Sequence, residues 1–180
     1  MQQKIVLIGG PGTGKTSVVN QLVKQGYYCM PEISREITLN AQKEGIDQLF
    51  LTDPLLFSKL LLEGREKQFL NAAEVTDEWV FFDRGLPDIY AYLEFSNTKY
   101  PPYFKEKCTF HKYDKVYLFL PWKEIYHNDN ERYEAFEGAK KINSFIEKAY
   151  RELGYTLINV PFGSLKERTD FIINSLKSDI

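Results

Sequence analysis

The sequence is poor in cysteine, nearly balanced in charge and free of long apolar runs. Only Cys29 and Cys108 occur, and neither forms a Cys-x-x-Cys pair, which argues against a zinc site or a disulfide framework. The net charge of −2 provides no general basic field for nucleic acid. No stretch reaches the roughly 18 apolar residues of a membrane span. We therefore expect a protein of reducing, cytoplasmic surroundings, without a membrane segment or a strong nucleic-acid signal.

The composition that is present is typical of a folded globular chain. Of the 180 residues, 43% are hydrophobic and 27% are charged, which argues against disorder. We see no repeat, low-complexity tract or linker, so the expectation is a single domain over residues 1–180. Aromatic residues make up 15% of the chain. They suit a bulky core, and a few of them could line a pocket for a flat ligand.

Hydrophobic patterning predicts alternating strands and helices. The expected strands cover 3–8, 27–30, 78–82, 115–120 and 156–160. The expected helices cover 14–25, 34–44, 54–73, 87–95, 133–153 and 164–176. Residues 97–104, which contain Pro101 and Pro102, are expected to be irregular. This alternation predicts an α/β fold of three layers, with a five-stranded, mainly parallel sheet and helices on both faces.

A glycine-rich loop follows the first strand and opens the first helix. It fits the pattern G-x-x-x-x-G-K-[ST] at every fixed position. Glycines allow backbone N–H groups to point inward at phosphate oxygens, and the helix N-terminus adds a positive dipole. Lys15 would reach the β- and γ-phosphates and the Thr16 hydroxyl would ligate magnesium. The predicted nucleotide-binding residues are Gly9, Gly10, Pro11, Gly12, Thr13, Gly14, Lys15, Thr16 and Ser17.

Asp83 and Arg84 follow the third strand. Ligands of an open α/β sheet gather at the carboxyl ends of its strands, so Asp83 is expected near the glycine loop. It could hold a magnesium-bound water or accept a proton from an attacking hydroxyl. Arg84 could orient a substrate or pair with an acid. The alternatives are that Asp83 caps the next turn and that Arg84 is a solvated surface charge.

Glu32 and Arg35 lie where the second strand gives way to a helix. Glu32 would face the same cleft and is a candidate general base or substrate hydrogen-bond acceptor. Arg35, one turn later, could bind an anionic substrate or pair with Glu32. The alternative for Glu32 is an acid in a first helical turn, where the helix dipole favours it.

The polar segment 122–132 joins the fourth strand to the next helix. A loop at this place could close over the phosphates and exclude water, and an arginine from it could neutralise charge on the transferred group. Arg132 is the candidate for this role. The alternative is an exposed arginine at the start of a helix.

Taken together, these motifs resemble those of the small AAA-domain P-loop ATPases and kinases. The resemblance rests on the glycine loop, Glu32 with Arg35, the run 82–88 and the run 150–161. Its layout is similar to the kinase part of nicotinamide-riboside kinases and to deoxynucleoside kinases. The resemblance implies a P-loop NTPase fold, a catalytic base at Glu32, metal and substrate contacts at Asp83 and Arg84, and a lid arginine at Arg132.

Three readings of the function follow from these motifs. The first is an ATP- and Mg²⁺-dependent kinase that transfers the γ-phosphate to a small nucleoside- or nucleotide-like acceptor. The second is a regulatory ATPase that acts as a switch on a protein partner, and a third reading is an inactive nucleotide-binding scaffold. The guanine motif Asn-Lys-x-Asp and the ABC-type run Leu-Ser-Gly-Gly do not occur. The motifs specify neither the acceptor nor the oligomeric state.

Overall fold

The computed structural model describes residues 2–125 and 136–178. It contains a parallel sheet in the order β2-β3-β1-β4-β5, and the four pairings among the described strands are all parallel. The strands are β1 (Gln3–Ile8), β2 (Tyr28–Met30), β3 (Trp79–Asp83), β4 (Lys115–Phe119) and β5 (Leu157–Val160). The sheet predicted from the sequence is therefore confirmed, with strand ends shifted by a residue or so.

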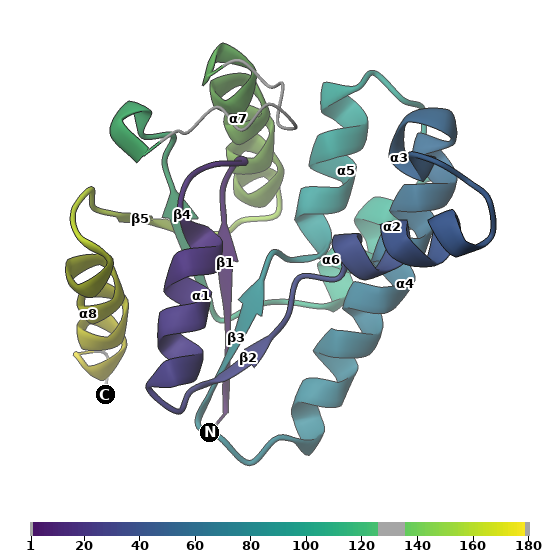
Figure 1. Ribbon diagram of the computed structural model, residues 1–180. Coiled ribbons are helices and arrows are strands. Elements are labelled where there is room, and N and C mark those ends of the chain that lie inside the picture. Colours follow the sequence, from purple (N-terminus) through teal and green to yellow (C-terminus); the bar gives the residue numbers. More distant parts are fainter. Residues whose placement is uncertain (1, 126–135, 179–180) are drawn as a thin grey trace.

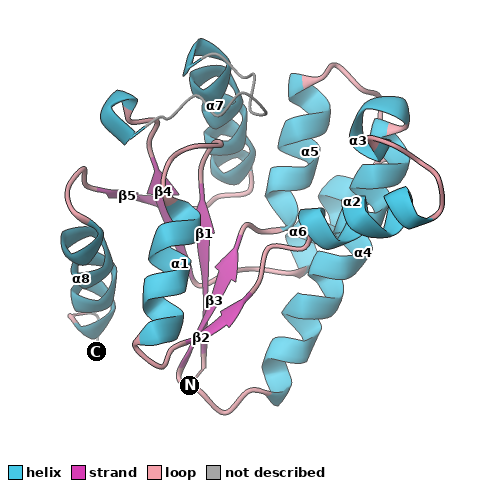
Figure 2. Ribbon diagram, viewed as in Figure 1, coloured by secondary structure: helices cyan, strands magenta, loops and turns pink. Residues whose placement is uncertain are grey.

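Helices cover both faces of this sheet (Figures 1 and 2). Helices α1 and α8 pack together on one face, and α4, α5 and α7 cover the other. The helices are α1 (Lys15–Lys24), α2 (Ser34–Lys43), α3 (Leu49–Thr52), α4 (Pro54–Asn71), α5 (Leu86–Phe95), α6 (Tyr103–Phe110), α7 (Phe136–Glu152) and α8 (Leu165–Lys177). Short 3₁₀ turns span Ala72–Glu74 and Lys123–Ile125. The predicted three-layer α/β fold is confirmed.

Two helices depart from the sequence prediction. Residues 97–104 were expected to be irregular, but α6 begins inside this range, and α3 was not expected at all. Pro102 occupies the N-cap position of α6, where a missing N–H group costs nothing. Phe104 and Cys108, four residues apart, are buried on one face of this helix. Burial of Phe104 and Cys108 thus stabilises a helix in a segment for which the two prolines predict irregular structure.

The central strand β1 supplies both layers of the core. Ile5 and Leu7 pack with residues of α1 and α8, whereas Val6 and Ile8 pack with residues of α5 and α7. All four side chains are fully buried, and each contributes about 1.5–3 kcal/mol when removed from water. Burial on both faces explains why this strand reads as a continuous apolar run rather than an alternating one.

The strand order places the functional motifs at one edge of the sheet. From β1 the chain crosses to the edge strand β2, returns to β3 beside β1, and then continues on the other side of β1 with β4 and β5. A crevice outside the carboxyl ends of the strands is expected where the order reverses. The register pairs Leu7 of β1 with Asp83 of β3, so Asp83 lies beside the strand that leads into the glycine loop.

The helix termini follow the signals read from the sequence. Asp53 is the N-cap of α4 and accepts a hydrogen bond of 2.9 Å from the Leu56 amide, as its position before Pro54 predicts. Ser164 and Glu167 form a capping box at the start of α8. In the described part of the chain, no helix combines the length and the apolar character needed to cross a bilayer.

Candidate active site

The glycine loop departs from conformations that other residues adopt easily. Gly9, Gly12 and Gly14 have φ angles of 138°, 70° and 83°, in a region where a Cβ atom is strained. At Gly9, a Cβ atom would also lie 2.4 Å from the backbone oxygen of Phe119. The loop therefore needs glycine for its backbone geometry and for its close approach to β4.

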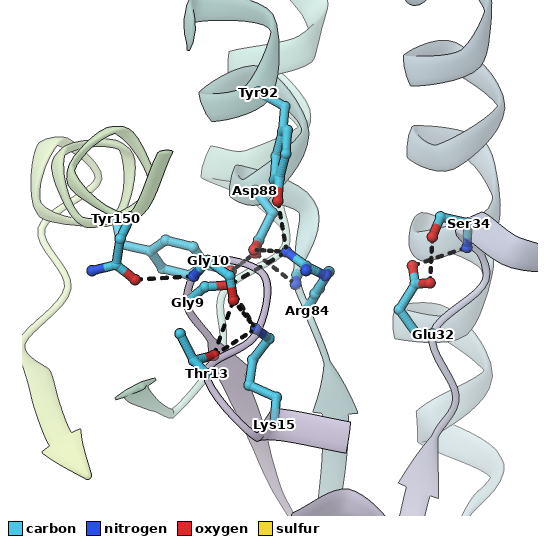
Figure 3. Close-up of polar contacts among 12 residues, drawn as sticks. Gly9, Gly10, Thr13, Lys15, Glu32, Ser34, Arg84, Asp88, Tyr92 and Tyr150 are labelled. Atoms are coloured by element: carbon cyan, nitrogen blue, oxygen red, sulfur yellow. Dashed lines mark hydrogen bonds and ion pairs between the residues drawn. The ribbon is translucent and has the colours of Figure 1, made fainter. Parts of the chain in front are cut away.

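Lys15 is buried, and its side chain turns back over the loop (Figure 3). Its Nζ donates hydrogen bonds of 2.7 Å to the carbonyl oxygens of Gly9 and Gly10, and one of 3.1 Å to the hydroxyl of Thr13. Burial, with a smaller contribution from the charge of Arg84, lowers the pKa of Lys15 to about 7. An anion bound beside Lys15 would therefore favour the protonated, charged form of its amino group.

Most amide groups of the loop are available to a ligand. The Gly10 amide donates a hydrogen bond of 2.9 Å to the side-chain oxygen of Asn143 on α7. Among the described residues, no hydrogen-bond acceptor pairs with the amides of residues 12–17. These amides surround the N-terminus of α1, where unpaired N–H groups and the helix dipole favour a phosphate. The hydroxyl-bearing residues Thr16 and Ser17 are exposed there.

A buried arginine supports the loop from the side of α8. The Arg168 guanidinium donates a hydrogen bond of 2.7 Å to the carbonyl oxygen of Thr13 and lies 4.8 Å from the ring centre of Phe119. A Cβ atom on Gly14 would come within 2.5 Å of this guanidinium. Burial lowers the pKa of Arg168. The close packing of loop, β4 and α8 thus holds the curve of the loop in place.

Asp83 and Arg84 lie at the end of β3, as predicted. The Asp83 carboxylate is buried, and burial raises its pKa, although the nearby Lys15 and Arg84 act in the opposite direction. The Arg84 guanidinium lies 3.4 Å from the carbonyl oxygen of Gly9 and 3.4 Å from the hydroxyl of Tyr92. Arg84 is therefore not a solvated surface charge, because it faces the glycine loop.

Glu32 lies just after the end of β2, apart from the glycine loop (Figure 3). Its carboxylate accepts hydrogen bonds from the amide of Ser34, at 2.9 Å, and from the Ser34 hydroxyl. The Arg65 guanidinium of α4 lies 3.4 Å away. Burial alone would raise the pKa of Glu32, but Arg65 and Ser34 outweigh it and the pKa falls. Glu32 is thus an ionised, partly exposed acceptor.

The structure does not bring Arg35 to Glu32, and it does not describe Arg132. Arg35 is exposed on α2, and the arginine that pairs with Glu32 is Arg65 rather than Arg35. Of the two roles that the sequence leaves open for Arg35, Arg65 takes the pairing with Glu32, and binding of an anionic substrate by Arg35 stays a prediction. Arg132 lies outside the described residues, so its role as a lid arginine also stays a prediction.

The oxygen donors at the loop fit a magnesium ion. Thr16 offers an exposed hydroxyl at the start of α1, and Asp83 offers a carboxylate at the neighbouring strand end. No group of three or more His, Cys, Asp or Glu side chains arranged to hold a metal occurs within the described ranges. Mg²⁺ usually binds through one or two protein oxygens together with water and substrate phosphates. The donor set therefore suits magnesium carried by a nucleotide.

The comparison with protein families identifies the group. A model of the AAA domain family matches residues 4–168. The chain belongs to this family. The resemblance read from the glycine loop and the later motifs is thus confirmed. A comparison with curated proteins found no match.

Solved structures place this AAA-domain chain among proteins with the P-loop NTPase fold. Deoxyadenosine kinase from M. mycoides is 20% identical, with a TM-score of 0.72 and coverage of 97% of this chain and 99% of that one. The NadR protein in complex with NR is 17% identical, with a TM-score of 0.74. This chain is covered to 98% but spans only 51% of NadR. Shikimate kinase from Acinetobacter baumannii is 16% identical, with a TM-score of 0.59, and coverage is 99% and 95%.

Three side chains of the AAA-domain site carry no local sequence signal. Arg65 lies in the middle of α4, Asn143 in α7 and Arg168 in α8, and all three are buried polar residues. In sequence they stand among ordinary helical residues, far from the motifs that they contact. A charged residue on the apolar face of a predicted helix is the only hint that such a sequence offers, because burial of a charge requires a partner.

Proposed function

We propose that this AAA-domain protein is a kinase that transfers the γ-phosphoryl group of ATP to a hydroxyl of a small nucleoside- or nucleotide-like acceptor. One observation carries the proposal. An ionised carboxylate, Glu32, is fixed by Arg65 and Ser34 after β2, with β3 between it and the strand that leads into the phosphate loop. A regulatory ATPase needs the loop, but it has no need for a general base held on the acceptor side.

The relatives support this reading. The solved structures similar to this chain include kinases that carry the names deoxyadenosine kinase and shikimate kinase. Deoxyadenosine kinase matches over nearly its whole length, so no large region of that enzyme lacks a counterpart here. A nucleoside-like acceptor is therefore the first class to test.

In the proposed reaction the acceptor hydroxyl oxygen forms a bond to the γ-phosphorus of ATP. The bond from that phosphorus to the β–γ bridging oxygen breaks, and ADP leaves. Glu32 accepts the proton of the hydroxyl, since its lowered pKa keeps it ionised at neutral pH. Lys15, Arg84 and the amides of residues 12–17 stabilise negative charge on the phosphates.

Thr16 and Asp83 would hold a magnesium ion in this arrangement, Asp83 through a bound water. When bound, Mg²⁺ neutralises charge on the phosphate oxygens and orients them. In this assignment Glu32 is the base and Asp83 binds the metal. The reason is that Asp83 lies beside β1 and Lys15, whereas Glu32 follows β2. Arg132 and Arg35 remain candidates from the sequence for phosphate and substrate contacts.

The proposal is tested by incubating the protein with ATP and Mg²⁺, together with a panel of nucleosides, nucleotides and small hydroxylated metabolites. We expect ADP formation that requires one acceptor class. Glu32→Gln should lower kcat by about 10²–10⁴-fold, the usual contribution of a general base. Glu36→Gln is the matched control, because Glu36 is an exposed acid in the first turn of α2, the helix that follows Glu32. ADP release that ignores every acceptor but responds to a protein partner would favour the switch instead.

A further inference from the structure

Two short motifs that are distant in sequence meet at a buried hydrogen bond. The hydroxyl of Tyr150 on α7 donates to Oδ2 of Asp88 on α5 at 2.8 Å, although 62 residues separate them. The Gly85 amide donates to the same oxygen at 2.9 Å. Tyr150 and Asp88 are almost fully buried. A Cβ atom on Gly85 would lie 2.4 Å from the Tyr150 hydroxyl, so a larger residue would push against this hydroxyl where the two motifs touch.

The second oxygen of Asp88 faces the candidate catalytic arginine. Asp88 Oδ1 lies 3.6 Å from Nη1 of Arg84 (Figure 3). It is buried, and no hydrogen bond to it is found in the described ranges. Tyr92 completes the surroundings of Arg84, with its ring centre 5.7 Å from the guanidinium carbon. The carboxylate therefore connects Tyr150 and Gly85 on one side with Arg84 on the other.

The backbone conformation of Arg84 also needs contacts from neighbouring residues to hold it. Its φ angle is 72°, a conformation that costs a non-glycine residue energy and persists only when neighbours impose it. The Arg84 amide donates a hydrogen bond of 3.1 Å to the carbonyl oxygen of Leu7 on β1. The turn aims the side chain at the glycine loop, where the guanidinium lies 3.4 Å from the Gly9 oxygen.

We propose that Asp88 and Tyr150 are positioning residues that hold the Arg84 guanidinium towards the polyphosphate of the nucleotide. The inference rests on the proposed function in one respect, namely that Arg84 contacts the phosphates. Asp88 supplies the counter-charge, and the hydroxyl of Tyr150, together with the Gly85 amide, fixes the carboxylate. Burial and the neighbouring Asp88 raise the pKa of Tyr150 well above its usual range, so the hydroxyl keeps its proton and remains a donor.

Tyr90 provides a matched control for a purely structural role of the Tyr150 hydroxyl. Tyr90 is also fully buried, and its hydroxyl donates a hydrogen bond of 2.6 Å to the backbone oxygen of Ala149 on α7. This oxygen belongs to the residue next to Tyr150, but the bond does not reach Asp88 or Arg84. Tyr90→Phe and Tyr150→Phe therefore both remove a buried hydroxyl between α5 and α7. Only Tyr150→Phe removes a hydrogen bond to Asp88, the carboxylate that faces Arg84.

The test is a double-mutant cycle read as the affinity for ATP with Mg²⁺ by calorimetry, on variants shown to be folded by thermal melts. We expect Arg84→Met and Tyr150→Phe each to weaken binding by about tenfold, the equivalent of about 1.4 kcal/mol for a lost charge-assisted contact. In the Arg84→Met background, Tyr150→Phe should add less than about twofold, because the group that it positions is gone. Asp88→Asn should behave like Tyr150→Phe, and Tyr90→Phe should keep wild-type affinity.

The outcomes separate the inference from the proposed function. Equal losses for Tyr150→Phe in the wild-type and Arg84→Met backgrounds, or equal losses for Tyr90→Phe and Tyr150→Phe, would overturn the positioning role. Wild-type affinity of Arg84→Met would overturn it as well, since Arg84 would then not contact the nucleotide. If the cycle behaves as expected but no acceptor is phosphorylated, the positioning role holds and the kinase assignment fails.

Discussion

Arg65 of α4 links Glu32 and the turn after β3. Its Nη2 lies 3.4 Å from the Glu32 carboxylate, and its Nη1 donates a hydrogen bond of 2.8 Å to the carbonyl oxygen of Gly85. The guanidinium is almost fully buried. One side chain therefore fixes the candidate base relative to the turn that carries Arg84, and this arrangement decides which chemistry the crevice supports.

The first prediction concerns the pH dependence that Arg65 imposes. Arg65 lowers the pKa of Glu32, so Glu32 is ionised at neutral pH. The protein should therefore lose activity only as the pH falls through this lowered pKa and Glu32 becomes protonated. Arg65→Met should raise the Glu32 pKa, and the acidic limb of the kcat/KM profile should move to higher pH.

Lys59→Met is the control for this shift, because Lys59 lies on the same helix but is half exposed and lies 4.0 Å from Glu63 instead of Glu32. It should leave the profile unchanged. An acidic limb that stays in place in Arg65→Met, with only a uniform loss of rate, would mean that Arg65 does not act through the charge of Glu32.

The second prediction is proton uptake on nucleotide binding. Burial and Arg84 lower the pKa of Lys15 to about 7, so at about pH 8 much of Lys15 is neutral before binding. Phosphate oxygens favour the charged ammonium. The binding enthalpy of ATP should therefore vary with the ionisation enthalpy of the buffer, with a sign that corresponds to proton uptake by the protein.

Two variants check that the proton goes to Lys15. Lys15→Arg stays charged throughout this range, so any residual binding should occur without uptake from this group. Lys15→Ala should abolish binding. Undiminished affinity in Lys15→Ala would show that the glycine loop does not hold the nucleotide, and uptake that persists in Lys15→Arg would assign the proton to another residue.

The third prediction concerns the packing at Gly85. Its φ angle of −121° suits any residue, so the cost of Gly85→Ala is steric. The new methyl group would lie 2.4 Å from the Tyr150 hydroxyl and 2.7 Å from the Tyr113 ring. We expect a loss of about 1–3 kcal/mol in the free energy of unfolding, as for other overpacked sites.

Thermal and urea denaturation measure this loss. Gly26→Ala is the comparison, because Gly26 has open space around it and only its φ angle of 88° opposes a side chain, at a cost of about 1 kcal/mol. Adding Tyr150→Phe should recover part of the Gly85→Ala loss by removing the clashing oxygen. An additive double mutant would show that the clash lies elsewhere.

The fourth prediction concerns the support of the loop from α8. Arg168→Lys keeps the positive charge, but a lysine lacks the planar group that reaches Thr13 and lies beside Phe119. The variant should lower the melting temperature and weaken ATP binding, because the Thr13 oxygen loses its donor. Lys166→Arg on the exposed face of α8 should change neither quantity. Wild-type affinity in a folded Arg168→Lys protein would show that the loop keeps its shape unaided.

The features that could be predicted from the sequence are those that depend on residues close together in the chain. The glycine loop is recognised from eight consecutive positions, and strand ends can be placed at one edge because parallel strands share a direction. Asp83, Arg84 and Glu32 follow from these two facts. The positions of α3 and α6 do not, since burial against distant elements decides whether such short segments become helical.

The buried side chains that hold the loop and Glu32 in place could not be predicted from the sequence for the same reason. Arg65, Asn143 and Arg168 contact segments that are between 20 and 155 residues away in the chain. No spacing rule connects such pairs, and only the packing of α4, α7 and α8 against the sheet brings them to the loop and the strand ends. Arg35 is the arginine near Glu32 in sequence, whereas Arg65 is the one that lies 3.4 Å from it in the fold.

The most direct test of the account identifies the product that receives the γ-phosphate. The protein is incubated with ATP, Mg²⁺ and the acceptor that stimulates ADP release, and the products are followed by ³¹P NMR. The account predicts one phosphate monoester of the acceptor for each ADP, and loss of this signal in Glu32→Gln and Lys15→Ala. Inorganic phosphate in place of the ester, formed at the same rate with and without every acceptor, would contradict it.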